Sequence, residues 1–228
     1  PERAGTEACS TGMSLSCLRL RRGEGPAAEA PARAIVAPVE NDRQRWDRRY
    51  REGATGGPRG PSVLLARFEA LLTGGVALDV ACGLGRNALW LAQRGYAVDA
   101  VDVSPIAIGR LRRAARQQGL PVRARVADLT RAHLPLDAYD LVVDCFYLDR
   151  ALVPALKGAV RPRGIVLLQT MNESALLREQ PANPAHLLRP GELAAWFEDF
   201  EVLWLEDDPE ASDVSGFVAR RPPRETFL

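Results

Sequence analysis

The sequence predicts an α/β fold with a single Rossmann-like, doubly wound, mainly parallel seven-stranded sheet that ends in a C-terminal antiparallel hairpin. Three observations predict it. Short apolar runs alternate with segments of helical spacing from residue 62 onward, which implies crossovers between parallel strands. Glycines follow several of the helical segments and mark their ends. The last two apolar runs, 201–205 and 214–219, have no helix between them, so they form a hairpin.

Each expected element rests on a local pattern. The charged segment 41–52 carries Trp46 and Tyr50 four residues apart, on one face of a helix, and the Gly- and Pro-rich run 53–61 forms a loop. Segment 105–118 has proline in its first turn and is followed by Gly119. The expected helices cover 41–52, 62–72, 86–94, 105–118, 150–160 and 190–197. The expected strands cover 76–80, 96–101, 122–126, 139–147 (a strand followed by a turn), 164–169, 201–205 and 214–219.

Length and charge indicate one soluble domain and argue against two classes of partner. The chain has 228 residues, and 46% of them are hydrophobic, which suffices for a core. No run approaches the roughly 18 apolar residues of a membrane-spanning helix. Lys and Arg total 30 against 29 Asp and Glu, a net charge of +1, so we expect neither a membrane nor a nucleic-acid partner. The oligomeric state stays open.

The first 40 residues differ from the rest of the chain. They lack hydrophobic periodicity and are rich in Ala, Pro, Gly and Arg, so we expect 1–40 to be a disordered or loosely packed tail and 41–228 to be the domain. Residues 13–22 are basic and free of acids, which leaves a targeting role open beside a tail without function. They contain no apolar core of a secretory signal.

Cysteine and histidine spacing argues against a metal centre. Four cysteines form no Cys-x-x-Cys pair, and the two histidines, His133 and His186, lie far apart in the sequence, so we expect no metal. Unpaired cysteines fit a reducing compartment, and we expect a cytoplasmic location.

The most informative segment is a strand that runs into Gly83-x-Gly85 and then into a helix. Glycines allow a tight turn and a close ligand, and the helix start favours an anionic group. Asp79 precedes this turn, and Asp102 closes the next strand, where a carboxylate can bind both ribose hydroxyls. Gly83-x-Gly85-x-x-Ala88 nearly fits a nicotinamide dinucleotide site, but the charge of Asp79 would repel a pyrophosphate. A ligand with a ribose, an ammonium and a carboxylate is S-adenosylmethionine, and we expect it as the cofactor.

At these residues the sequence resembles the class I S-adenosylmethionine-dependent methyltransferases. The matching segments are Asp79–Gly85, Asp102-Val-Ser-Pro-Ile-Ala, Ala127-Asp128-Leu129 and Asp140–Asp144. The sequence from Gly85 to Ile108, together with the upstream segment WDRRY, resembles that of the tellurite-resistance/thiopurine methyltransferase-like branch. Resemblance to this branch implies a small-molecule acceptor, often with a soft nucleophile.

The motif and the resemblance together give a set of candidate site residues. The resemblance implies that Asp128 contacts the adenine, that Val103 packs on it, and that Cys145 and Phe146 face the methionine part. It also implies that the segment with Trp46, Arg49 and Tyr50 overlies the cofactor, although packing of a helix onto the core explains these aromatics equally well. The expected cofactor-binding residues are Trp46, Arg49, Tyr50, Asp79, Ala81, Gly83, Gly85, Arg86, Asn87, Asp102, Val103, Asp128, Leu129 and Cys145.

Expectations for the acceptor come from the loops after the fourth and fifth strands, which should line its pocket. The expected substrate-binding residues are Tyr147, Arg150 and Asn172, with the alternative that Arg150 forms a structural salt bridge. No catalytic residue is predicted, because methyl transfer from a sulfonium depends mainly on positioning and desolvation.

Three functions remain open at this point. The first is methylation of a small molecule, in particular a thiol, selenium or tellurium species. The second is methylation of a protein or RNA. The third is a nonenzymatic protein that binds S-adenosylmethionine as a partner of other proteins.

Overall fold

The fold was determined as a computed structural model, which describes residues 41–53, 60–177 and 183–224. The tail predicted for 1–40 and most of the predicted loop 53–61 lie outside the described residues. The strands are β1 (Gly75–Val80), β2 (Tyr96–Asp102), β3 (Val122–Val126), β4 (Tyr139–Cys145), β5 (Val160–Met171), β6 (Glu201–Glu206) and β7 (Val214–Arg220). The helices are α1 (Asp42–Arg51), α2 (Val63–Arg67), α3 (Arg86–Ala92), α4 (Pro105–Gln117), α5 (Val153–Ala159) and α6 (Glu192–Trp196). None of the described helices is both long and apolar enough to cross a bilayer.

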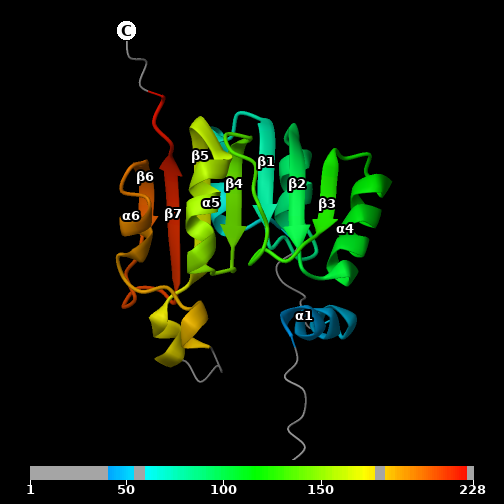
Figure 1. Cartoon of the computed structure of the whole chain (residues 1–228), viewed down its shortest axis with the longest axis horizontal. Coiled ribbons are helices and arrows are strands. Elements are labelled where there is room, and N and C mark those ends of the chain that lie inside the picture. The colour runs from blue at the N-terminus through cyan, green and yellow to red at the C-terminus, as the bar shows by residue number, and fades with distance from the viewer. Residues whose placement is uncertain (1–40, 54–59, 178–182, 225–228) are drawn as a thin grey trace, which may run out of the picture. The chain divides into compact units, whose positions relative to one another are not determined.

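The seven strands form one sheet in the order β3-β2-β1-β4-β5-β7-β6 (Figure 1). β1 to β5 pair in parallel, whereas β7 is antiparallel to both β5 and β6. The predicted doubly wound sheet and its hairpin are therefore confirmed. The hairpin is arranged so that β7, the last strand in sequence, lies between β5 and β6, and β6 forms the edge.

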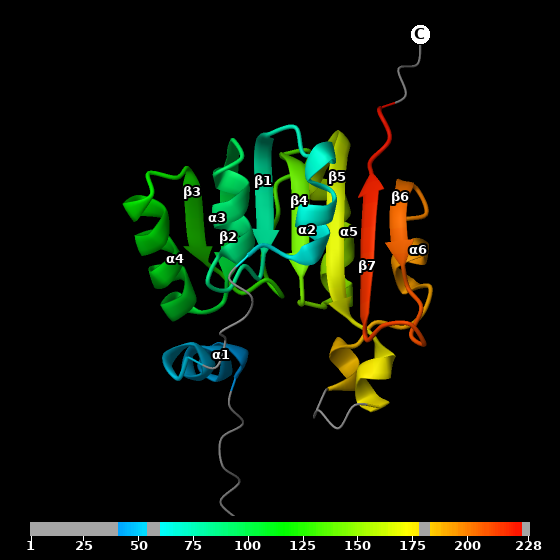
Figure 2. The ribbon, with the colours of Figure 1, turned by 180° about the vertical axis from the view of Figure 1, so that it is seen from behind.

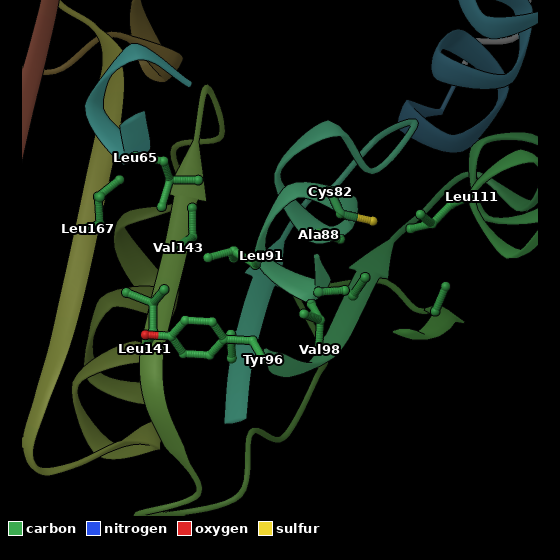
Figure 3. Packing of buried hydrophobic residues seen from close by; sticks show 14 of the residues in the cluster. Leu65, Cys82, Ala88, Leu91, Tyr96, Val98, Leu111, Leu141, Val143 and Leu167 are labelled. Atoms are coloured by element: carbon green, nitrogen blue, oxygen red, sulfur yellow. The ribbon is translucent and has the colours of Figure 1, made fainter. Parts of the chain in front are cut away.

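Helices cover both faces of the sheet, and each face has its own apolar core. On one face, α2, α3 and α4 contribute Leu65, Leu91 and Leu111 to a cluster with Leu141 and other strand residues (Figures 2 and 3). On the other face, α5 and α6 pack with a second apolar cluster of strand residues. This burial on both faces explains why the central strands read as nearly continuous apolar runs.

Every predicted helix is shorter in the structure, and the helices predicted for 62–72 and 150–160 differ most. The strand predicted for 164–169 is longer and spans Val160–Met171. The segment 62–72 forms α2 and then a 3₁₀ turn at Glu69–Leu71, because Phe68 leaves helical geometry. The Phe68 ring instead packs 5.5 Å from the ring of Trp204. The segment 150–160 begins as a 3₁₀ turn, and Val160 already belongs to β5. In the first case the contact with Trp204 overrides the local pattern, and in the second Val160 pairs with Tyr139 of β4.

The position of the functional site follows from the strand order. Sequence order reverses between β1 and β4, which are neighbours in the sheet. At such a switch point the connections leave toward opposite faces, and a crevice opens beyond the carboxyl ends of the strands. Helix α1 lies beyond these ends (Figure 1). Its Asp47 carboxylate accepts a hydrogen bond from the hydroxyl of Ser104, the residue that precedes α4.

Candidate functional site

A cavity of about 590 Å³ opens at this switch point. Its size falls within the range of about 300–1,000 Å³ that is usual for small-molecule sites. Residues from α1, from the loops after β1 to β4 and from the start of α3 line it. They are Asp42, Trp46, Arg49, Tyr50, Asp79, Ala81, Cys82, Gly83, Leu84, Arg86, Asn87, Asp102, Val103, Ala127, Asp128, Leu129, Thr130, Cys145, Phe146 and Tyr147.

The glycine-rich turn forms the floor between β1 and α3 and is tied to the end of β2. The amide of Gly83 donates to Asp102 Oδ2 at 2.8 Å, and the amide of Cys82 donates to the carbonyl of Val101 at 2.9 Å. Gly83 has φ +54°, and a Cβ there would lie 2.8 Å from the hydroxyl of Tyr50. Glycine is needed at this position because α1 approaches the turn so closely.

The side chain of Asp79 is a buried carboxyl group in which only one oxygen accepts a hydrogen bond from a described residue. Its Oδ2 accepts the amide of Ala88 at 3.0 Å, whereas Oδ1 has no hydrogen-bond partner among the described residues. Burial is the main reason that the pKa of Asp79 rises to about 7. A buried acceptor without a donor is costly, so this oxygen is suited to a ligand that brings its own donor.

We expect Asp79→Asn to gain stability relative to the parent protein as the pH rises from 4 to 8. The pKa of Asp79 is higher in the folded protein, at about 7, than in an unfolded chain, at about 3.9. Ionisation therefore favours the unfolded state, and its penalty grows between these two values and stays constant above them. The difference in unfolding free energy should shift by roughly 2–4 kcal/mol toward the variant between pH 4 and pH 8. Urea unfolding at both pH values measures it, and a difference that does not change with pH would contradict the assignment.

Asp102 is held by two backbone amides. The amide of Ser104 donates to Oδ1 and that of Gly83 donates to Oδ2, each at 2.8 Å. Burial raises the pKa of Asp102, and these two hydrogen bonds oppose the rise. Each carboxylate oxygen keeps a further lone pair, so the group can also accept the two hydroxyls of a ribose.

Helix α1 both packs on the domain and lines the cavity, so the two explanations of its aromatics are compatible. Tyr50 is buried, and its ring stacks 5.8 Å from that of Trp46. The guanidinium of Arg49 lies 5.1 Å above the Trp46 ring. Asn41 caps the helix through a capping box with Gln44, which fixes where it begins.

The loop after β3 brings Asp128, Leu129 and Thr130 to the cavity. Asp128 is exposed, and its Oδ1 accepts the hydroxyl of Thr130 at 2.7 Å and the amide of Thr130 at 3.0 Å. These hydrogen bonds lower the pKa of Asp128. Its side chain is therefore ionised and oriented at the cavity wall.

The loop after β4 contributes Cys145, Phe146 and Tyr147. Burial raises the pKa of the Cys145 thiol to about 12, so the thiol stays protonated and is a poor nucleophile. Phe146 has φ +65° and remains 48% exposed, although its amide donates to the carbonyl of Gln169 at 2.7 Å. This loop therefore presents a fixed aromatic ring to the cavity.

Three residues expected at the site do not line the cavity. Gly85 instead faces Leu111, and a Cβ on Gly85 would lie 2.2 Å from Leu111 Cδ1. The guanidinium of Arg150 donates hydrogen bonds to the carboxylate of Glu192 and to the carbonyls of Ala185 and Leu187. Arg150 therefore forms the structural salt bridge that is predicted from the sequence as its alternative role.

Asn172, the third of them, is fully buried. Its amide nitrogen donates to Ser212 and Ser215, and its oxygen accepts from Ser174. The other expected residues, including Tyr147, do line the cavity. Sequence reasoning gave no role to Asp42, Leu84 or Thr130, which line it as well. Asp42 gives no signal of its own, because an acid in the first turn of a helix is common.

Comparison with known proteins agrees with this geometry. Residues 77–164 match a family model described as a methyltransferase domain. A protein of Eikenella corrodens named hemagglutinin 1 is 32% identical over 57% of this chain and 45% of its own length. A thiopurine S-methyltransferase of Stutzerimonas stutzeri is 33% identical over 58% of this chain and 61% of its own length. The chain thus matches less than two thirds of either relative.

A solved structure shares the fold. TehB from Haemophilus influenzae superposes with a TM-score of 0.63 at 18% identity, over 78% of this chain and 67% of TehB. The match over residues 77–164, the sheet order and the cavity at the switch point agree with the class I S-adenosylmethionine-dependent methyltransferases. Its similarity to the thiopurine S-methyltransferase, on a fold shared with TehB, agrees with the resemblance to the tellurite-resistance/thiopurine methyltransferase-like branch.

The cofactor of this class is S-adenosylmethionine, and the cavity fits it. The cofactor carries an ammonium group, and the unpartnered, buried Oδ1 of Asp79 offers an acceptor for it. It also carries a ribose, and the carboxylate of Asp102 is fixed at the end of β2. A dinucleotide would place a pyrophosphate beside Asp79, where the carboxylate would repel it.

Proposed function

We propose that the chain transfers the methyl group of S-adenosylmethionine to a small-molecule acceptor, whose methylated atom is a soft nucleophile such as the sulfur of a thiol or a selenium or tellurium species. The observation that carries the proposal is the buried, unpartnered oxygen of Asp79, which lies beside the Asp102-tied turn at the switch point. A site built for a cation and a ribose suits this cofactor.

We propose the following roles for the residues around the cofactor. Asp79 accepts hydrogen bonds from the ammonium group, and Asp102 accepts hydrogen bonds from the ribose hydroxyls. The turn at Gly83 contacts the carboxylate of the cofactor. Asp128 accepts the adenine amino group, while Val103 and Leu129 pack against the ring. Positions along the cavity wall support this order. Asp79 lies near the end of β1, Asp102 ends β2 and Asp128 follows β3, and these strands are neighbours in the sheet.

The chemistry asks the protein for positioning more than for proton transfer. When bound, S-adenosylmethionine supplies an electrophilic methyl group on a sulfonium. An ordinary thiol has a pKa of about 8.5, so a useful fraction is ionised near neutral pH without a base. Tyr147 is a poor base here, since burial and neighbouring carboxylates raise its pKa and keep the phenol protonated. What the chain must do is hold the two reactants in line and exclude water.

Two further observations support the proposal. One relative is named for methylation at sulfur, which agrees with a soft acceptor atom. The described cysteines, Cys82 and Cys145, are both free thiols, which fits a reducing compartment and a cytoplasmic location.

The proposal predicts micromolar binding of S-adenosylmethionine and methyl transfer to small thiols. Calorimetry on the full chain measures binding, and conversion of labelled cofactor to S-adenosylhomocysteine measures transfer. The acceptors are aromatic and aliphatic thiols, selenite and tellurite, with the matched phenols and amines as controls. Faster turnover of the soft acceptors supports the proposal. Absence of cofactor binding, or activity only in cell-extract fractions from which small molecules have been removed, would contradict it.

A further inference from the structure

Two guanidinium groups, those of Arg49 and Arg86, line the cavity. Arg49 lies over the Trp46 ring, and the Cζ of Arg86 lies 6.0 Å from the centre of the Phe146 ring. Among the residues that the structure describes, neither guanidinium forms an ion pair with a carboxylate. Arg49 is exposed to solvent, whereas Arg86 is half-buried in the cavity wall, so Arg86 is the guanidinium that can bind an anionic ligand inside the cavity.

The cofactor supplies one carboxylate, and Arg49 is the better placed of the two to bind it. Arg49 projects from α1 next to Tyr50 in the chain. Burial raises the pKa of Tyr50, and the charge of Arg49 opposes that rise, so the two groups are close. The Tyr50 hydroxyl in turn lies against Gly83, at the turn assigned to the carboxylate. One guanidinium is therefore used by the cofactor, and the second has no assigned partner.

Arg86 lies toward the end of the cavity formed by the loop after β4. Its positive charge acts on the thiol of Cys145 and on Asp79, in addition to its contact with Phe146. In the sheet, β2 and β1 lie between β3, which Asp128 follows, and β4. We assign the acceptor to the β4 end of the cavity. Arg86 is thus a cation at the acceptor end.

Phe146 adds an apolar surface at the same end. Bulky residues rarely adopt a positive φ, because it costs on the order of 1–3 kcal/mol, and such strain is concentrated at functional sites. Phe146 has φ +65°, and its ring is nonetheless 48% exposed rather than packed in the core. The backbone thus holds an aromatic face toward the cavity, where a planar group can stack on it.

We propose that the acceptor carries an anionic group, separate from the atom that is methylated, which binds Arg86, and a planar apolar body that packs on Phe146. The inference rests on the proposed function, which it deepens by naming the class of acceptor. It makes Arg86 a specificity-determining residue, because a neutral acceptor of the same shape leaves the half-buried guanidinium without an anionic partner.

The test uses two probes that match in shape and differ in charge. Benzoate and benzamide are titrated into the full chain saturated with S-adenosylhomocysteine, and binding is followed by calorimetry. We expect benzoate to bind at least tenfold more tightly than benzamide. In Arg86→Gln the ratio should fall to within twofold, whereas Phe146→Ala should weaken both probes and keep the ratio. Equal binding of the two probes to the parent protein would overturn the inference.

Arg49→Gln is the matched control. It should weaken S-adenosylhomocysteine tenfold or more and, at saturating S-adenosylhomocysteine, leave the benzoate-to-benzamide ratio unchanged. If Arg86→Gln instead weakens S-adenosylhomocysteine as strongly as Arg49→Gln does and leaves the probe ratio intact, Arg86 belongs to the cofactor and the inference is wrong. A probe ratio that depends on Arg86, found together with no turnover of soft acceptors, would support the inference and overturn the proposed acceptor atom. Thermal melting of each variant confirms that it folds.

Discussion

Asp102→Ala is expected to weaken S-adenosylmethionine binding at least 100-fold, which is a loss of about 2.8 kcal/mol. The alanine removes the proposed acceptor of both ribose hydroxyls. It also leaves the amides of Gly83 and Ser104 without their acceptor, so the turn that should meet the cofactor loses its tie to β2. Hydrogen bonds to a charged group contribute about 1.5–3 kcal/mol each, which makes the expected loss a conservative figure. Calorimetry with the folded variant measures it.

Asp99→Ala is the control for this experiment. Asp99 lies on the same strand, three residues earlier, but its carboxylate pairs with Arg123 and accepts the Tyr139 hydroxyl. Asp99 does not line the cavity. The affinity of the Asp99→Ala variant for S-adenosylmethionine should therefore stay within about twofold of the parent value. Unchanged affinity in a folded Asp102→Ala variant would refute the assignment of the ribose site.

Gly85→Ala is expected to cost about 2–5 kcal/mol of unfolding free energy. Two effects add here. Gly85 has φ +80°, which is unfavourable for alanine by about 1–2 kcal/mol. The new Cβ would also lie 2.2, 2.7 and 2.8 Å from three side-chain atoms of Leu111, which is fully buried and cannot move away as a surface side chain could. Overpacking of this kind typically adds about 1–3 kcal/mol.

Gly95→Ala separates the two effects. Gly95 has a similar φ of +87°, but a Cβ there meets no atom within 4 Å. Urea unfolding should therefore show a cost of only about 1–2 kcal/mol for Gly95→Ala, the backbone part alone. Equal costs for the two variants would show that Leu111 accommodates the methyl group. A double variant with Leu111→Ala should recover part of the packing cost if the clash is real.

The fold was predictable where local pattern and global structure agree. The strands at 76–80 and 96–101 were predicted to within a residue or two because turn glycines or a helix stop bound their apolar runs. The site was predictable for a related reason, since parallel strands in one sheet bring their carboxyl ends to one edge. Asp79 and Asp102 are 23 residues apart in the sequence, yet they end on adjacent strands.

The sequence could not show which polar side chains are already committed to other parts of the protein. Arg150 looks like a ligand-binding cation until Glu192, 42 residues further on, is seen to pair with it. Asn172 is satisfied by serines some 40 residues away. Gly85 follows a ligand-binding pattern, but its missing side chain makes room for a leucine of α4. Each of these outcomes depends on a long-range contact, and a local pattern does not encode such contacts.

The position of β7 has a consequence for the order in which the sheet is completed. β7 follows β6 in the chain but separates it from β5, and its register joins Ile165–Met171 on one side to Glu201–Glu206 on the other. During synthesis, β5 is therefore an unpaired, apolar edge strand until β7 emerges from the ribosome. Until then β6 also has no strand to pair with. Such unpaired edges are prone to aggregation, and pairing across a large sequence separation is slow. Chaperone dependence of this protein in the cell should thus be concentrated in the interval between the synthesis of β5 and that of β7.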